Sequence, residues 1–125
     1  MMHNLVLSKL GHTWILDLDG TVLKHNGYLI DGKDTLFPQA KDFIDSIPEK
    51  DMIIFLTSRK EEFRSITEEF LKEQEIRCDH IVFDVPYGER ILINDRKPSG
   101  LQTAYSINPD RDKWEKINVI EDDNR

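Results

Sequence analysis

Two acidic residues separated by one leucine follow an apolar run near the start of the chain, in Trp14-Ile15-Leu16-Asp17-Leu18-Asp19-Gly20-Thr21. Successive side chains of a strand point to opposite faces, so Asp17 and Asp19 share a face and can reach one site beyond the strand end. Two carboxylates this close favour a divalent cation, because unpaired like charges side by side are costly. Gly20 lets the backbone turn sharply there. The same residues also suit an ordinary exit from a strand into a turn.

Two later apolar runs also end in polar residues. The run Met52-Ile53-Ile54-Phe55-Leu56 is typical of a strand covered on both faces, and it leads into Thr57-Ser58-Arg59. A hydroxyl at this point can cap the next helix, whose first N–H groups can also face an anion. The run Arg90-Ile91-Leu92-Ile93 leads in the same way into Asn94-Asp95 and predicts a further central strand. Arg90 opens that strand and is therefore expected at the end away from the acidic tip.

The segment D-L-D-G-T after an apolar strand resembles the first signature of the haloacid dehalogenase (HAD) superfamily, most of whose members are magnesium-dependent phosphotransferases, chiefly phosphatases. The resemblance implies that Asp17 is the nucleophile that accepts the phosphoryl group. It implies that Asp19 is a general acid and base and lends its backbone carbonyl to the metal. The three motifs follow the family's order over residues 13–98. We therefore expect a single HAD-like core domain over residues 1–125.

The third motif departs from the family pattern. Many relatives carry two consecutive aspartates where this chain has Asn94-Asp95. An Asn carbonyl ligates Mg²⁺ without adding charge, so Asp95 is the expected ligand beside Asp17 and Asp19, with Asn94 as the alternative.

The resemblance also implies a phosphate site. Its expected members are the backbone amides of Leu18 and Gly20, together with Thr57, Ser58 and a nearby cation. The family's usual lysine precedes the last acidic motif, but residues 81–90 contain no lysine. Lys97 is the preferred substitute, and Lys60 and Arg59 are the alternatives.

The order of the elements predicts the fold class. Apolar residues at helical spacing predict helices over residues 38–47 and 60–75. Strand, helix, strand, helix and strand in succession imply a mostly parallel central sheet with helices on both faces, a three-layer α/β fold that resembles the Rossmann-like HAD core. Ligands of such sheets bind beyond the carboxyl ends of the strands, where all three motifs fall. Asn26-Gly27 predicts a small β-hairpin flap, and residues 103–107 predict an edge strand. The intervals between the motifs leave no room for a cap domain.

Composition narrows the class of protein. The chain has 125 residues, 38% hydrophobic residues and a net charge of −7, which describes an acidic protein of single-domain size. The acidic balance argues against a nucleic-acid partner. No apolar run approaches the ~20 residues that cross a membrane, and no signal peptide is evident. The lone Cys78 excludes an intramolecular disulfide and fits a reducing compartment, so we expect a cytoplasmic protein in which this thiol is a packing residue.

The expected function is Mg²⁺-dependent hydrolysis of a phosphomonoester through an aspartyl-phosphate. The second and third motifs are similar to those of small capless HAD proteins associated with bacterial surface-polysaccharide synthesis, which favours a sugar phosphate over other small phosphorylated metabolites. An open site is also compatible with a homo-oligomer. The main alternative is a catalytically weak or inactive HAD-like binding or scaffold protein, which the missing lysine and Asn94 encourage. A response-regulator receiver domain fits less well, because Thr57 stands where its phosphorylated Asp belongs; a phosphomutase would use the same chemistry.

Overall fold

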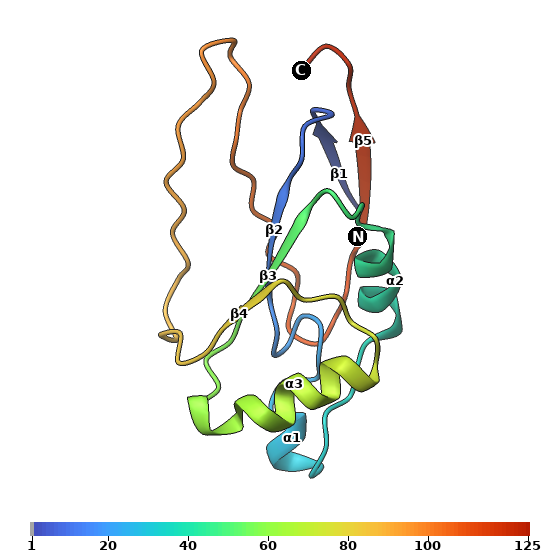
Figure 1. The fold of residues 1–125 in the computed structure, drawn as a ribbon, viewed down its shortest axis with the longest axis vertical. Helices are drawn as coiled ribbons and strands as arrows, with labels where there is room; N and C mark the ends of the chain where they lie inside the picture. The colour runs from blue at the N-terminus through green and yellow to red at the C-terminus, as the bar shows by residue number, and fades with distance from the viewer. Residues whose placement is uncertain (1) are drawn as a thin grey trace.

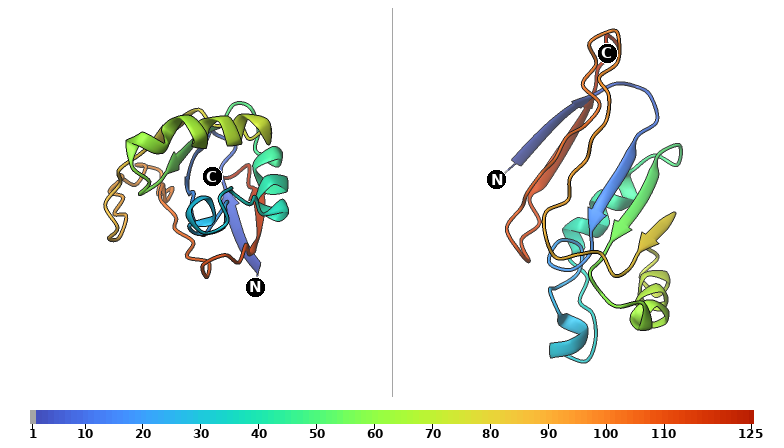
Figure 2. Two further views of the ribbon diagram at one scale, coloured as in Figure 1. Left: turned by 90° about the horizontal axis from the view of Figure 1, so that it is seen from below. Right: turned by 90° about the vertical axis from the view of Figure 1, so that its left-hand side faces the viewer.

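The computed structural model describes residues 2–125 and shows a mixed α/β protein with two small parallel sheets (Figure 1). The central sheet has the order β2-β3-β4, with β2 at Thr13–Asp17, β3 at Met52–Leu56 and β4 at His80–Val82. The second sheet pairs β1 (Met2–Leu7) with β5 (Lys116–Glu121). The two sheets stand apart in the right-hand view of Figure 2. Apolar runs in the sequence predict β2 and β3, whereas β1 and β5 are not among the predicted strands.

The register of the central sheet brings two motifs to the same level. Asp17 at the end of β2 lies opposite Leu56 at the end of β3, so Thr57 follows directly beside the Asp17 loop. Parallel strands end at one edge of a sheet, and the first two motifs therefore meet there as expected.

Four helical segments accompany the sheets. They are α1 (Gly27–Ile30), α2 (Pro38–Ser46), the 3₁₀ helix η1 (Glu61–Phe63) and α3 (Arg64–Glu73). Both predicted helices are confirmed to within a few residues at their ends, and a proline occupies the first turn of α2, where its missing N–H costs nothing. None of the helices within residues 2–125 is long and apolar enough to cross a membrane.

The hydrophobic core lies on one face of the central sheet. Alternate residues of β2 and β3 share this face with buried residues of α2 and α3; the cluster includes Leu16, Ile53, Phe55, Ala40, Ile44 and Leu71. The other face leaves Ile15, Met52 and Val82 between 42% and 49% exposed. The expectation of helices on both faces is thus wrong for this chain, because both long helices bury their apolar sides in the same cluster.

The largest difference from the predicted fold lies in residues 86–107, here called the arm. The arm has no regular secondary structure and extends along one side of the molecule as an open loop (Figures 1 and 2). The predicted strands over residues 90–94 and 103–107 are therefore wrong. A strand persists only where a neighbour satisfies its backbone N–H and C=O groups, and the arm has no ladder partner among the described strands.

The predicted β-hairpin at Asn26-Gly27 is also wrong. A tight hairpin turn of this type needs positive φ at both residues, whereas Asn26 alone is left-handed (φ 54°) and Gly27 begins α1. A wider flap forms in its place. An antiparallel bridge joins Leu23 to Leu36 at its base, and α1 lies within it.

Candidate active site

Asp17 ends β2 at the carboxyl edge of the sheet, and 41% of its side chain is exposed. Its Oδ2 accepts a hydrogen bond from Thr21 Oγ1 at 3.2 Å, and its Oδ1 lies 3.6 Å from Arg90 Nη2. Burial raises the pKa of the Asp17 carboxyl above its usual 3.8, and this effect outweighs the lowering by Arg90 and Thr21. A carboxylate that is both accessible and partly desolvated suits a nucleophile.

Asp19 is held differently, although it is only two residues away. Its Oδ2 accepts a 2.8 Å hydrogen bond from Thr57 Oγ1, and its Oδ1 accepts bonds of 3.0 and 2.8 Å from Arg59 Nε and Nη2. Its side chain is only 14% exposed. Both carboxylate oxygens of Asp19 are therefore engaged within the protein.

Arg59 is the centre of a buried network. Its guanidinium also binds both oxygens of Asp34, at 2.6 and 3.1 Å, and donates to Thr67 Oγ1 at 2.9 Å. The ring of Tyr28 lies 3.9 Å from the guanidinium carbon. Burial alone lowers the pKa of Arg59, but the bonds to Asp34 and Asp19 raise it overall, so the guanidinium stays charged. Of the three cations considered from the sequence, Arg59 does reach the acidic motif, and it pairs with Asp19.

The two backbone amides that were expected to bind phosphate, those of Leu18 and Gly20, already donate to carbonyl groups of the protein. The Leu18 N–H donates to a carbonyl of β3 at 3.1 Å, and the Gly20 N–H donates to the Leu23 carbonyl at 2.7 Å. Within residues 2–125, the N–H groups of Asp19 and Ser58 have no protein acceptor. These two amides, from the loops after β2 and β3, are the donors available to an anion at this edge.

Thr57 acts on the site by binding the Asp19 carboxylate. Its side chain is fully buried, and its hydroxyl donates a hydrogen bond to the Asp19 carboxylate. The same oxygen accepts the Arg59 N–H at 3.1 Å. Thr57 therefore fixes the orientation of Asp19 at this edge of the sheet.

The expected metal ligands are only partly brought together. Asp17 ends β2 and Asp19 follows it, whereas Asn94 and Asp95 lie on the arm, where the Asn94 amide donates to the Thr103 carbonyl at 3.3 Å. In the part of the chain that the structure describes, no three His, Cys, Asp or Glu side chains are grouped as a metal site.

The cation beside Asp17 is Arg90, and this corrects the expectation that Arg90 lies away from the acidic tip. Residues 90–94 form no strand, and the arm passes the carboxyl end of β2 at Arg90. Lys97, the preferred candidate, lies at the turn of the arm. Lys60 is largely exposed, with its Nζ 3.9 Å from Asp84 Oδ1.

Sequence reasoning missed several groups around this loop. Asp34 looks like an ordinary residue of a polar loop, and no local signal shows that Arg59 will bind it. The segment before β5 also closes over the loop: the Asp112 N–H donates to the Gly20 carbonyl at 2.7 Å. Gly20 has φ +85°, a backbone conformation that favours glycine, and a Cβ there would lie 3.2 Å from Arg111 Cγ, so the Arg111 side chain would have to shift for any other residue.

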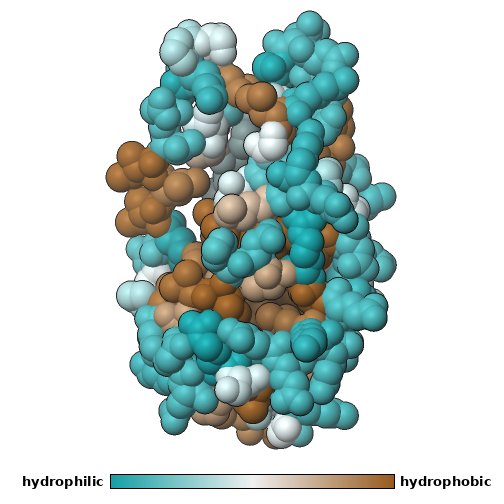
Figure 3. Space-filling model, in the orientation of Figure 1, coloured by the Kyte–Doolittle hydropathy of each residue, from teal (hydrophilic) through white to brown (hydrophobic). Residues whose placement is uncertain are grey.

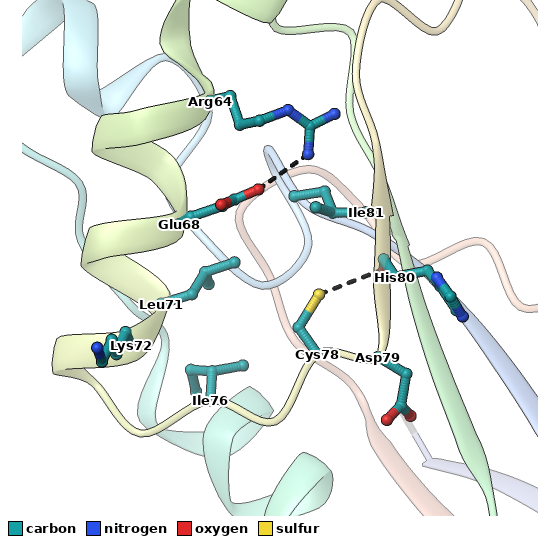
Figure 4. A pocket seen from close by; sticks show the side chains of 9 residues that line it. All are labelled: Arg64, Glu68, Leu71, Lys72, Ile76, Cys78, Asp79, His80 and Ile81. Atoms are coloured by element: carbon teal, nitrogen blue, oxygen red, sulfur yellow. Dashed lines mark hydrogen bonds and ion pairs between the residues drawn. The ribbon is translucent and has the colours of Figure 1, made fainter.

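A groove of about 510 Å³ lies elsewhere, between α3 and β4 (Figure 4). Its lining includes Arg64, Glu68, Leu71 and Cys78, and none of the site residues predicted from the sequence. Burial raises the pKa of the Cys78 thiol to about 11, so the thiol stays protonated and unreactive. The groove is therefore separate from the Asp17 site.

Comparisons with protein-family models, with curated proteins and with solved structures find no match to this chain.

Proposed function

We propose that this protein is a HAD-like phosphomonoester hydrolase in which Asp17 attacks phosphorus. The observation that carries the proposal is the position of Asp17. Its carboxylate is accessible at the carboxyl edge of a parallel sheet, where ligands of such sheets bind, and Arg90 lies 3.6 Å from it. A nucleophile beside a cation is the minimal arrangement for phosphoryl transfer.

The first step forms a bond between an Asp17 oxygen and phosphorus while the bond to the leaving oxygen breaks. The product is an aspartyl-phosphate. Arg90 stabilises the negative charge that develops on the transferring oxygens, and the Asp19 and Ser58 amides are placed to donate to them. Water then attacks phosphorus and restores the Asp17 carboxylate.

Asp19 is proposed as the group that protonates the leaving oxygen and later takes a proton from water. Either role requires one of its present contacts to open, because both of its oxygens are engaged. Thr57 can adapt to a protonated Asp19, since a hydroxyl both donates and accepts. Arg59 then keeps the carboxyl group in place through the other oxygen.

The residues of this site provide the smallest number of protein ligands with which Mg²⁺ is usually bound. Mg²⁺ is usually bound through one or two carboxylates together with substrate phosphate oxygens and water. Asp17 offers one accessible carboxylate, and the Asp19 backbone carbonyl is the ligand that the family resemblance adds. When bound, the ion would neutralise charge on the phosphoryl group.

The substrate we propose is a small phosphorylated metabolite, with a sugar phosphate favoured by the resemblance. The net charge of −7 opposes the approach of an anion, so attraction must come from local groups such as Arg90 and the free amides.

The test is release of phosphate from a chromogenic ester and from a panel of sugar phosphates, with Mg²⁺ and with EDTA. Asp17→Asn is expected to lower the rate by about 10⁴-fold or to the background, because it removes the attacking carboxylate. Asp45→Asn on α2 is the matched control and keeps the wild-type rate. Activity that survives Asp17→Asn contradicts the proposed nucleophile.

A binding or scaffold role is the second candidate. It is favoured by one observation, the engagement of both Asp19 oxygens by Thr57 and Arg59. A folded wild-type protein that releases no phosphate from the whole panel would support this role over hydrolysis.

A further inference from the structure

Three consecutive apolar residues of the arm face solvent. Ile91, Leu92 and Ile93 are 83%, 59% and 92% exposed. Figure 3 shows a hydrophobic group standing out from the left side of the molecule, where the arm runs in Figure 1. An extended, unpaired apolar segment of this kind is a site for pairing with another strand.

A free strand edge lies beside the proposed site. Among the described elements β2 pairs only with β3, so its second edge carries no ladder. Ile15 of β2 is 49% exposed on the open face of the sheet. An incoming strand at this edge would satisfy the backbone of β2 and cover Ile15.

The arm cannot add to its own β2 as a parallel strand. A parallel crossover needs about a dozen residues or more, whereas only residues 83–90 separate β4 from the apolar run. The arm instead leaves from Arg90 at the carboxyl end of β2 and runs back toward the opposite end of the strand (Figure 1). Its direction is therefore opposite to that of its own β2.

We propose that residues 90–95 of one copy add as a strand to the free β2 edge of a second copy, in a twofold-symmetric dimer. In the arrangement we infer, the twofold axis is perpendicular to the strands, so the β2 strands of the two copies run in opposite directions. An arm that runs back along its own β2 is then parallel to the β2 of the partner. The exchange is reciprocal, as twofold interfaces require, and each arm covers the edge that the other copy leaves open.

The pairing has a defined register. With Asp95 level with Asp17 of the partner subunit, Ile93 lies beside Ile15 of the partner subunit, because positions two apart share a face. Asp95 then supplies the second carboxylate that the Asp17 site lacks within one chain. The exchange itself is independent of the proposed hydrolysis, whereas this role of Asp95 rests on it.

The first test is the mass in solution, measured by light scattering after gel filtration. The wild-type chain is expected at twice its 14.7 kDa. Ile91→Lys with Ile93→Lys is expected to be monomeric, because two charges would enter the exchanged strand. Leu29→Lys with Ile30→Lys places the same charges on exposed apolar residues of α1 and should remain dimeric. A monomeric wild type, or a dimeric arm variant, overturns the proposal.

A covalent test does not depend on those variants folding. Ile15→Cys with Ile93→Cys, in a Cys78→Ser background, places two thiols at adjacent-strand distance in the proposed register. Mild oxidation should yield a covalent dimer on a non-reducing gel. A disulfide within one chain, or no disulfide, contradicts the exchange.

The shared site is tested by coexpressing two variants with different tags. Asp17→Asn and Asp95→Asn are each expected to be inactive alone. Their mixture should recover about a quarter of the wild-type rate, because half of the dimers are mixed and each has one intact site. No recovery overturns the role of Asp95. If the cysteine variant forms the covalent dimer but the wild-type protein releases no phosphate, the exchange is supported and the proposed hydrolase function is refuted.

Discussion

The ionisation of Asp17 links the proposed chemistry to the pH of the solution. The attacking form is the carboxylate, so kcat/KM should rise with pH through the raised pKa of this group. Arg90 lowers that pKa from 3.6 Å away, although less than burial raises it.

Arg90→Gln is therefore expected to move the acidic limb of the pH–rate profile to higher pH and to reduce kcat. Both effects follow from the loss of the positive charge beside the Asp17 carboxylate. The measurement is kcat/KM against pH, with Arg125→Gln as a control at the far end of the chain. A limb that stays in place shows that Arg90 does not act on the titrating group.

Asp17 is also expected to lower the stability of the fold at neutral pH. Its folded-state pKa is above the unfolded value of 3.8, so folding disfavours the ionised form. The stability contribution is most favourable below pH 3.8 and decreases as pH rises through the folded-state pKa. Asp17→Asn should accordingly raise the melting temperature at pH 7, and this gain should vanish in acid. An equal or lower melting temperature at pH 7 would show that Thr21 and Arg90 outweigh burial.

At the scale of elements, the Arg59 network joins three separate parts of the chain. Arg59 follows β3, Asp19 follows β2 and Asp34 belongs to the flap. The Arg59 side chain is 1% exposed, and two carboxylates would remain close together without it. The network thus positions the Asp19 carboxylate and fastens the flap.

Arg59→Met is expected to lower the free energy of unfolding by about 3–5 kcal/mol, because it leaves two largely buried carboxylates without their counterion. Urea unfolding followed by circular dichroism measures the change. Arg125→Met at the chain end should change it by about 0.5 kcal/mol or less. A double variant, Arg59→Met with Asp34→Leu, should recover part of the loss; if it does not, the carboxylate repulsion is not the cause.

At the scale of the whole molecule, a single chain leaves one sheet edge, one sheet face and an apolar segment uncovered. The central sheet has helices on one face and a free edge at β2. The apolar residues of the arm are exposed and have no strand partner within the described chain. These features are consistent with an obligate pair, in which folding and association are coupled.

The melting temperature of the wild type is therefore expected to rise with protein concentration, because mass action favours the dimer. Scanning calorimetry over a hundredfold range of concentration tests this, and the Ile91→Lys, Ile93→Lys variant should lose the dependence. A constant melting temperature for the wild type indicates a monomer over that range.

The sequence by itself determined the parts of this protein that depend on near neighbours along the chain. Apolar runs fixed β2 and β3, helical periodicity fixed α2 and α3, and Gly20 marked the turn after Asp17. Local hydrophobic pattern is sufficient to indicate such elements, because the length and periodicity of an apolar run distinguish a strand from a helix and show which side it buries.

Only the tertiary structure decided where the segments after β4 go and which charges meet. The apolar run after Arg90 has the pattern of a strand, but a strand is stable only beside another strand. The connection from β4 to this run is too short for the run to pair with β2 of the same chain as a parallel strand. The pairing of Arg59 with Asp19 and Asp34, and of Arg90 with Asp17, likewise depends on contacts across the fold. Residues distant in the chain make these contacts, and no local pattern encodes them.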